Sequence, residues 1–229
     1  MRLAAAFAVL AATTAGAAPG AVAAPARVCR LVTDARNDTA VAPGTVTSPA
    51  GTQEPSLDIV SADLASDTRW LTTAVRVADL QLPTGISSHG LGHSLYFRAG
   101  EHRYVVYAYA VPSGRYAGLY RVTWDGVGTP LEQNGTARTE EEITARTRVT
   151  YDVARSEVRV SVPVTAFAAD GGLRPGTRID EIQAVTWRDR QVSADPVLAG
   201  RWGERDGADA AAATNAYTAG RPSCLKPGS

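Results

Sequence analysis

Short runs in which apolar and polar residues alternate are the feature that most limits how this chain can fold. In the clearest run, residues 157–164, valine occupies every second position from Val158 to Val164. Successive side chains of a β-strand point to opposite faces of a sheet, so this run predicts a strand that is buried on one face. Pro163 cannot donate a hydrogen bond to a neighbouring strand, and we therefore expect a sheet edge or a strand end there.

Further runs of this kind follow one another along the chain, separated by glycine, proline and other turn residues. We expect strands at residues 28–33, 57–65, 70–80, 93–99, 102–111, 116–124, 146–152 and 178–188. Residues 146–152 and 157–164 are close enough in sequence to form a hairpin. Short strands with short links predict an all-β fold, a single antiparallel, jelly-roll-like β-sandwich.

Other segments are expected to lie outside the strands. One helical turn is predicted at residues 165–169 and another at 209–215, where alanine favours helix. Loops are expected at residues 40–55 and 189–208. The run Glu140–Glu142 is interpreted as a solvated group of charges before a strand.

Two cysteines, Cys29 and Cys224, lie close to the two ends of the sequence. Residues 1–26 have the pattern of a secretory signal peptide, with a basic residue, an alanine-rich apolar stretch and small residues before a cleavage site. Outside the cell an even pair of cysteines is normally bridged. The sequence thus predicts a secreted single domain at residues 27–229, with its ends tied by a disulfide. In the chain-entropy model, closing so long a loop stabilises a fold by roughly 5 kcal/mol.

The charge balance argues against two classes of partner. The chain has 23 basic and 23 acidic residues. This balance supplies no electrostatic attraction to nucleic acid or to an anionic membrane surface. The signal-like stretch is too short and too weakly apolar to span a bilayer, so we expect no membrane anchor after cleavage. We expect a monomer.

Three stretches of the sequence resemble a group of small exported actinobacterial proteins that have no assigned function. They are residues 29–34 (CRLVTD) followed by Asp38, residues 57–64 (LDIVSADL) and residues 217–224 (YTAGRPSC). More distantly, the strand pattern is similar to extracellular β-sandwiches of the DOMON and family 9 carbohydrate-binding-module type. This second resemblance implies binding of sugar or haem, although a shared fold does not carry a shared function.

The histidines give little support to haem or metal binding. Haem ligated by methionine and histidine, as in some DOMON domains, is excluded because Met1 is lost with the signal peptide. His89 and His93 have the spacing of half a metal site. The two glycines between them favour a polar loop or the start of a strand instead.

Sugar binding normally requires aromatic rings at the surface. The candidates are Trp124, Trp187, Trp70 and Tyr104. Trp124 and Trp187 are preferred because charged residues follow each of them at a strand end. Tyr107 and Tyr109 share a strand face with Val105, which favours burial in the core, where large aromatic residues are common.

A group of acidic and amide side chains is the candidate for a metal site, and calcium bound there would have a structural role. Its members are Asp34, Asn37, Asp38, Asp58, Asp206 and Asp209. Calcium prefers six to eight oxygen ligands, and the disulfide would bring these loops towards one end of the domain. The same residue types also stabilise turns by bonding to backbone N–H groups, and this interpretation, with no bound cofactor, is preferred to calcium.

Catalytic motifs are poorly developed. The sequence around Ser94 lacks the final glycine of a nucleophile elbow, and bridged cysteines cannot act as nucleophiles. The sequence therefore predicts a secreted, non-catalytic binding or interaction module, with an extracellular glycan or an envelope protein as the candidate partner. The alternative is a structural or protein-interaction protein of the cell envelope, and a hydrolase is the least favoured interpretation.

Overall fold

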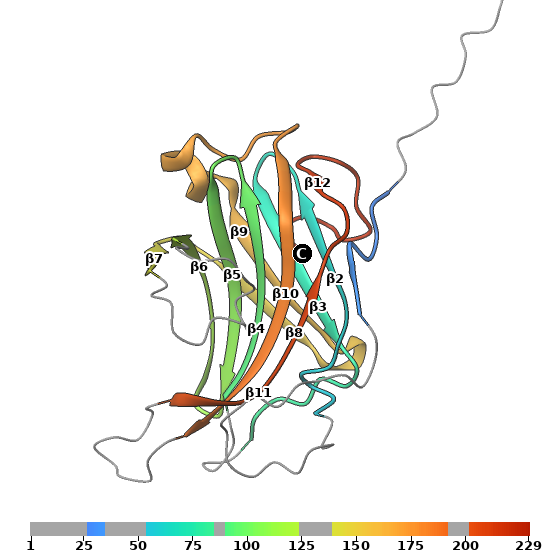
Figure 1. The fold of residues 1–229 in the computed structure, drawn as a ribbon, viewed down its shortest axis with the longest axis vertical. Coiled ribbons are helices and arrows are strands. Elements are labelled where there is room, and N and C mark those ends of the chain that lie inside the picture. Colours follow the sequence, from blue (N-terminus) through green and yellow to red (C-terminus); the bar gives the residue numbers. More distant parts are fainter. Residues whose placement is uncertain (1–26, 35–53, 85–89, 124–138, 192–201) are drawn as a thin grey trace, which may run out of the picture.

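The chain forms an all-β sandwich of two sheets whose strands cross obliquely (Figure 1). This computed structural model describes residues 27–34, 54–84, 90–123, 139–191 and 202–229. Every pairing between its strands is antiparallel. The predicted fold class is therefore confirmed. The predicted signal peptide lies outside the described residues. Within the described ranges, no helix has the length and apolar character needed to cross a membrane.

The smaller sheet has five strands in the order β1-β2-β3-β9-β8. They are β1 (Val32–Thr33), β2 (Ile59–Ser66), β3 (Trp70–Val77), β9 (Glu157–Pro163) and β8 (Arg148–Asp152). The alternating valines Val158, Val160 and Val162 all point into the core, as predicted. Pro163 is the last residue of β9, so its missing N–H interrupts no hydrogen-bond ladder.

The larger sheet has seven strands in the order β11-β10-β4-β5-β6-β7, with β12 also paired to β10. They are β11 (Trp202–Ala212), β10 (Arg178–Gln191), β4 (Gly90–Ala99), β5 (His102–Val111), β6 (Gly114–Thr123), β7 (Thr139–Ile143) and β12 (Tyr217–Thr218). Its inner face supplies Leu95, Phe97 and Val106 to the core.

Three sequence-based expectations for this sheet are wrong. Residues 209–212 form strand rather than helix, because Asp209, Ala210 and Ala211 pair in register with β10, and this pairing outweighs the helix propensity of alanine. The expected loop at residues 189–208 is shortened by the same pairing. The glutamates of residues 140–142 belong to the edge strand β7, which pairs with β6.

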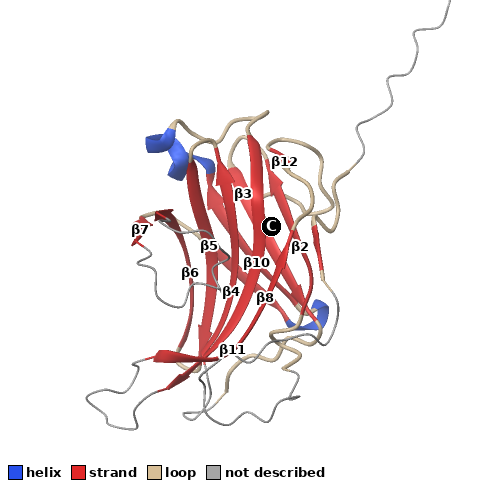
Figure 2. Cartoon of the chain, viewed as in Figure 1, coloured by secondary structure: helices blue, strands red, loops and turns tan. Residues whose placement is uncertain are grey.

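Short 3₁₀ helices lie at opposite ends of the sandwich (Figure 2). They are η1 (Val153–Arg155), which joins β8 to β9, and η2 (Val164–Asp170), which follows β9. The helical turn predicted at residues 165–169 is confirmed within η2. Phe167 of this turn is buried and packs against Tyr104, with ring centroids 5.0 Å apart.

The predicted disulfide between Cys29 and Cys224 is present and joins residues 195 positions apart in sequence. Beside it, the N–H of Cys224 donates to the carbonyl of Val28 at 3.0 Å. The strand expected at residues 28–33 is shorter than predicted. Arg30 adopts a left-handed backbone with φ of 51°, which interrupts the extended conformation before β1.

Candidate functional site

The outer face of the larger sheet carries an apolar cluster that is separate from the core. Its buried members are Tyr96, Val105, Val122, Val185 and Trp187, with Tyr107, Tyr109, Tyr120 and Ala210 packed against them. An antiparallel sheet that packs on a core with one face commonly presents polar residues on the other. Both faces of this sheet are apolar, so its outer face is the main candidate for a binding surface.

Glycines on the same face make room for the aromatic rings. A Cβ atom at Gly90 would lie 2.0 Å from the hydroxyl oxygen of Tyr109, and a Cβ at Gly118 would lie 2.5 Å from Cε1 of Tyr107. Both distances are shorter than the closest contact that non-bonded atoms can make, so a side chain at either position would clash with the ring. The absence of a side chain at these glycines therefore allows each ring to lie over the backbone of the neighbouring strand.

Tyrosines of β5 and β6 form the accessible part of this surface, which we call the tyrosine face. It comprises Tyr107, Tyr109, Tyr116 and Tyr120. Tyr116 is 52% exposed, and the other three tyrosines are partly exposed. Tyr107 and Tyr120 stack with their centroids 5.2 Å apart. Burial, and after it a hydrogen bond with Tyr120, raises the pKa of Tyr107.

The structure does not bring the predicted aromatic candidates together. Trp187 belongs to the outer cluster but is only 9% exposed. Trp70 lies on the smaller sheet, where the guanidinium of Arg148 sits 4.3 Å from its ring centroid. Trp124 lies outside the described residues.

The prediction that Tyr104 is a ligand-binding ring at the surface is wrong. It is 2% exposed, and its hydroxyl donates to Asp170 Oδ2 at 2.8 Å inside the sandwich. Tyr107 and Tyr109 were wrongly assigned to the core. The alternation of side chains along β5 correctly places Tyr104 on the face opposite to Tyr107 and Tyr109. Both faces of the strand are apolar, however, and the pattern alone does not tell which of them meets the other sheet.

A row of polar side chains crosses the inner face of the larger sheet. His93 on β4, Thr186 on β10 and Asp209 on β11 stand side by side in register. The segment 56–59, which enters β2, runs over this row. Thr186 Oγ1 donates to the carbonyl of Leu57, and Asp209 Oδ2 accepts the N–H of Ile59 at 2.7 Å. These bonds fasten the two sheets to each other.

His93 is fully buried in this row. Burial lowers its pKa to about 4, and the neighbouring backbone of Ser56 offsets part of that effect. The ring is therefore neutral at physiological pH. Neither ring nitrogen forms a well-oriented hydrogen bond with a described residue. Because side chains alternate along β4, His93 and Ser94 point to opposite faces of the sheet, and they do not form a base and nucleophile pair.

The predicted calcium ligands are not assembled in the described part of the chain. No group of three or more histidine, cysteine, aspartate or glutamate side chains there is arranged to hold a metal ion. Asp209 instead binds the backbone N–H groups of Ile59 and Ala210. Asp34 and Asp58 are described but do not join it in such a group. Asn37 and Asp38 lie outside the described residues, as does the side chain of Asp206.

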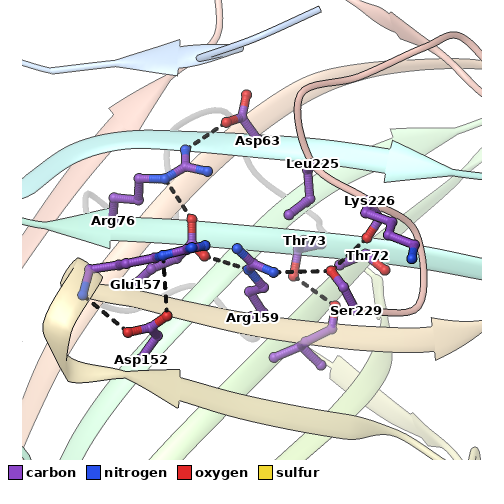
Figure 3. Close-up of polar contacts among 12 residues, drawn as sticks. Asp63, Thr72, Thr73, Arg76, Asp152, Glu157, Arg159, Leu225, Lys226 and Ser229 are labelled. Atoms are coloured by element: carbon purple, nitrogen blue, oxygen red, sulfur yellow. Dashed lines mark hydrogen bonds and ion pairs between the residues drawn. The ribbon is translucent and has the colours of Figure 1, made fainter.

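The outer face of the smaller sheet holds a chain of ion pairs (Figure 3). Arg76 bridges the buried carboxylates of Asp63 and Glu157, with both N–O distances at 2.6 Å. Arg159 also pairs with Glu157 and continues to the hydroxyl of Ser229. Each carboxylate has a cationic partner, so we interpret this network as structural.

The C-terminal segment lies across this same face. Leu225 packs with Ala65 and Ala74 in a small apolar cluster, and the N–H of Gly228 donates to Thr72 Oγ1 at 2.8 Å. The disulfide precedes this segment and fixes where it begins.

Comparisons of the chain with protein-family models, curated proteins and solved structures gave no match. The candidate site is therefore defined by its own geometry. Sequence reasoning overlooked the glycines beneath the rings. The signal for them was present, because glycine occupies alternate positions in Gly90-Leu91-Gly92 within an otherwise strand-like segment.

Proposed function

We propose that this protein is a secreted, non-catalytic binding module that holds an extracellular glycan on its tyrosine face. The observation that carries the proposal is the set of tyrosine rings laid over glycines on the outer surface of β5 and β6. Aromatic rings pack against the apolar C–H face of a sugar, while phenol groups donate and accept hydrogen bonds with its hydroxyls. The disulfide supports an oxidising location.

The chemistry of the face favours an uncharged polysaccharide. The four side chains that define the tyrosine face are all neutral, and the nearest strand neighbour of Tyr120 on β7 is the acidic Glu142. A negative charge at the rim disfavours acidic sugars. The rings lie along two neighbouring strands, and such a row suits internal units of a polysaccharide better than a single terminal sugar.

Binding to neutral polysaccharides tests this proposal. We expect the protein to sediment with at least one insoluble neutral polysaccharide, and Tyr116→Ala to weaken that binding about fivefold, the value of one lost aromatic contact. Tyr107→Ala should weaken it further, because Tyr107 also holds Tyr120 in its stack. Val153→Ala is a matched control, since Val153 is 50% exposed but lies on η1.

Failure to bind any neutral glycan, with the fold intact by circular dichroism, would refute the proposal. So would binding that both tyrosine variants leave unchanged. Capture of an envelope protein that depends on Tyr116, without glycan binding, would establish the alternative function in protein interaction.

A further inference from the structure

Two clefts flank the Cys29–Cys224 disulfide, and cationic side chains line both. The first has a volume of about 590 Å³ and is lined by Arg30, Arg178 and Arg221, among others. The second has a volume of about 370 Å³ and is lined by Arg27, Arg221 and Lys226, among others. Arg221 therefore stands between the two. Neither cleft has an aspartate or glutamate among its described lining residues.

This concentration of positive charge contrasts with the rest of the molecule. The chain as a whole has equal numbers of acidic and basic residues. Arginines such as Arg76 and Arg121 are each held by two carboxylates. Among the described residues, no carboxylate pairs with Arg30 or Arg221. Arg178 is partly neutralised, because its Nε lies 3.0 Å from Asp180 Oδ2.

The backbone that carries these cations is held in place on several sides. The disulfide fixes Cys29 next to Arg30, whose φ of 51° is in the left-handed region that residues with side chains rarely adopt. The carbonyl of Arg221 accepts a hydrogen bond of 2.9 Å from the hydroxyl of Tyr217. That hydroxyl also accepts the N–H of Ser66 at 3.0 Å. The cationic side chains therefore start from a fixed frame.

We infer that these two clefts form a binding site for an anionic polymer, separate from the tyrosine face. A guanidinium presents a planar fork of N–H donors that matches the oxygens of phosphate and carboxylate groups. Thr33, Thr214 and Asn215 add hydroxyl and amide groups to the first cleft. Because Arg221 lines both clefts, successive anionic groups of one chain would be held on either side of it. The sequence suggests a calcium ion where the chain ends meet. The clefts there are instead lined by positively charged side chains, which would repel a cation.

The test uses the disulfide-bonded protein and two soluble probes, linear polyphosphate and polygalacturonate. Calorimetric titration should show binding of at least one probe that weakens as salt is added, because the contacts are charge pairs at the surface. Arg30→Gln combined with Arg221→Gln should reduce the affinity by about tenfold or more. Arg30→Lys, which keeps the charge but lacks the fork of N–H donors, should reduce the affinity less than the double glutamine variant does. Arg155→Gln is the control, since that arginine is exposed on η1.

The two probes separate the sources of the anionic group. Binding of polyphosphate alone assigns the site to polymers that carry phosphate groups, and binding of polygalacturonate alone assigns it to polymers that carry carboxylate groups. Binding of both supports the shared oxyanion chemistry. The inference is overturned if neither probe binds, or if the double variant keeps its melting temperature and still binds like the unmodified protein. An equal loss in Arg155→Gln would also overturn it.

Discussion

The indole ring of Trp187 on β10 occupies the space above Gly92 on β4, where a Cβ atom would lie 2.1 Å from Cε2 of the ring. Two residues earlier, Gly90 receives Tyr109 from the opposite side, strand β5. Aromatic rings from both neighbouring strands, β5 and β10, thus pack directly against the backbone of the glycine-rich start of β4. This arrangement explains why glycine, a poor strand former, persists within a central strand.

Substitution of Gly92 by alanine should displace the ring of Trp187. Overpacking of this kind costs about 1–3 kcal/mol of unfolding free energy, and we expect a matching shift in tryptophan fluorescence. Urea denaturation measures the cost. In a Trp187→Ala background, Gly92→Ala should cost much less, because the clash is gone. Additive costs in the double variant would show that the two residues do not interact.

His93 should make the protein less stable in mild acid. Its pKa is about 4 in the folded state and about 6.5 in an unfolded chain. As the pH falls below 6.5 the unfolded state gains a proton that the folded state does not, and stability is lost until the pH reaches the folded value. Between pH 7 and pH 5 the loss should be about 2 kcal/mol.

The pH dependence can be assigned to His93 by substitution. Urea unfolding at several pH values should show a flatter profile for His93→Gln than for the unmodified protein. An unchanged slope in His93→Gln would contradict the assignment.

Removing Arg76 should destabilise the fold strongly. The side chains of Asp63 and Glu157 are each 2% exposed, and Arg76 bridges them. Arg76→Leu therefore removes the cationic partner of Asp63 and leaves Glu157 with Arg159 alone. We expect a loss of about 3 kcal/mol in chemical denaturation. Arg155→Leu is the matched control. Its pair with Asp152 is at the surface, with an N–O distance of 3.6 Å, and should be worth less than about 1 kcal/mol.

Asp209 should stabilise the fold as a hydrogen-bond acceptor rather than as a charge. Asp209→Ala removes the acceptor for the buried N–H of Ile59 and should cost about 1–3 kcal/mol. Asp209→Asn keeps an oxygen at that position and should cost less. Faster hydrogen exchange at the Ile59 amide in the alanine variant would locate the effect. Equal losses in both variants would point to the charge instead.

Local pattern predicted most strands because each depends on short-range alternation. The hairpin of β8 and β9, the end of β9 at Pro163 and the whole of β5 follow from the sequence. Strand β11 could not be predicted in this way, because its alanine-rich sequence favours helix when it is taken alone. Its strand conformation depends on pairing with β10, which no local signal reports.

The candidate sites were harder to predict than the fold. Alternation in β5 placed Tyr107 opposite to Tyr104, but which residue faces the other sheet depends on how the two sheets pack. The cationic clefts depend on still longer-range structure. Arg30 and Arg221 are far apart in the sequence, and the clefts form because the disulfide brings these two residues together.

The contacts that lock the two sheets also set the order in which this chain can fold. The N–H of Ile59 bonds to a carboxylate 150 residues further along, and the carbonyl of Leu57 accepts from a hydroxyl 129 residues away. Hairpins such as β2–β3 can form early, but these two bonds cannot form until β10 and β11 have been synthesised. Closing such distant contacts is slow, so we expect the bonds that join segment 56–59 to β10 and β11 to form late in folding.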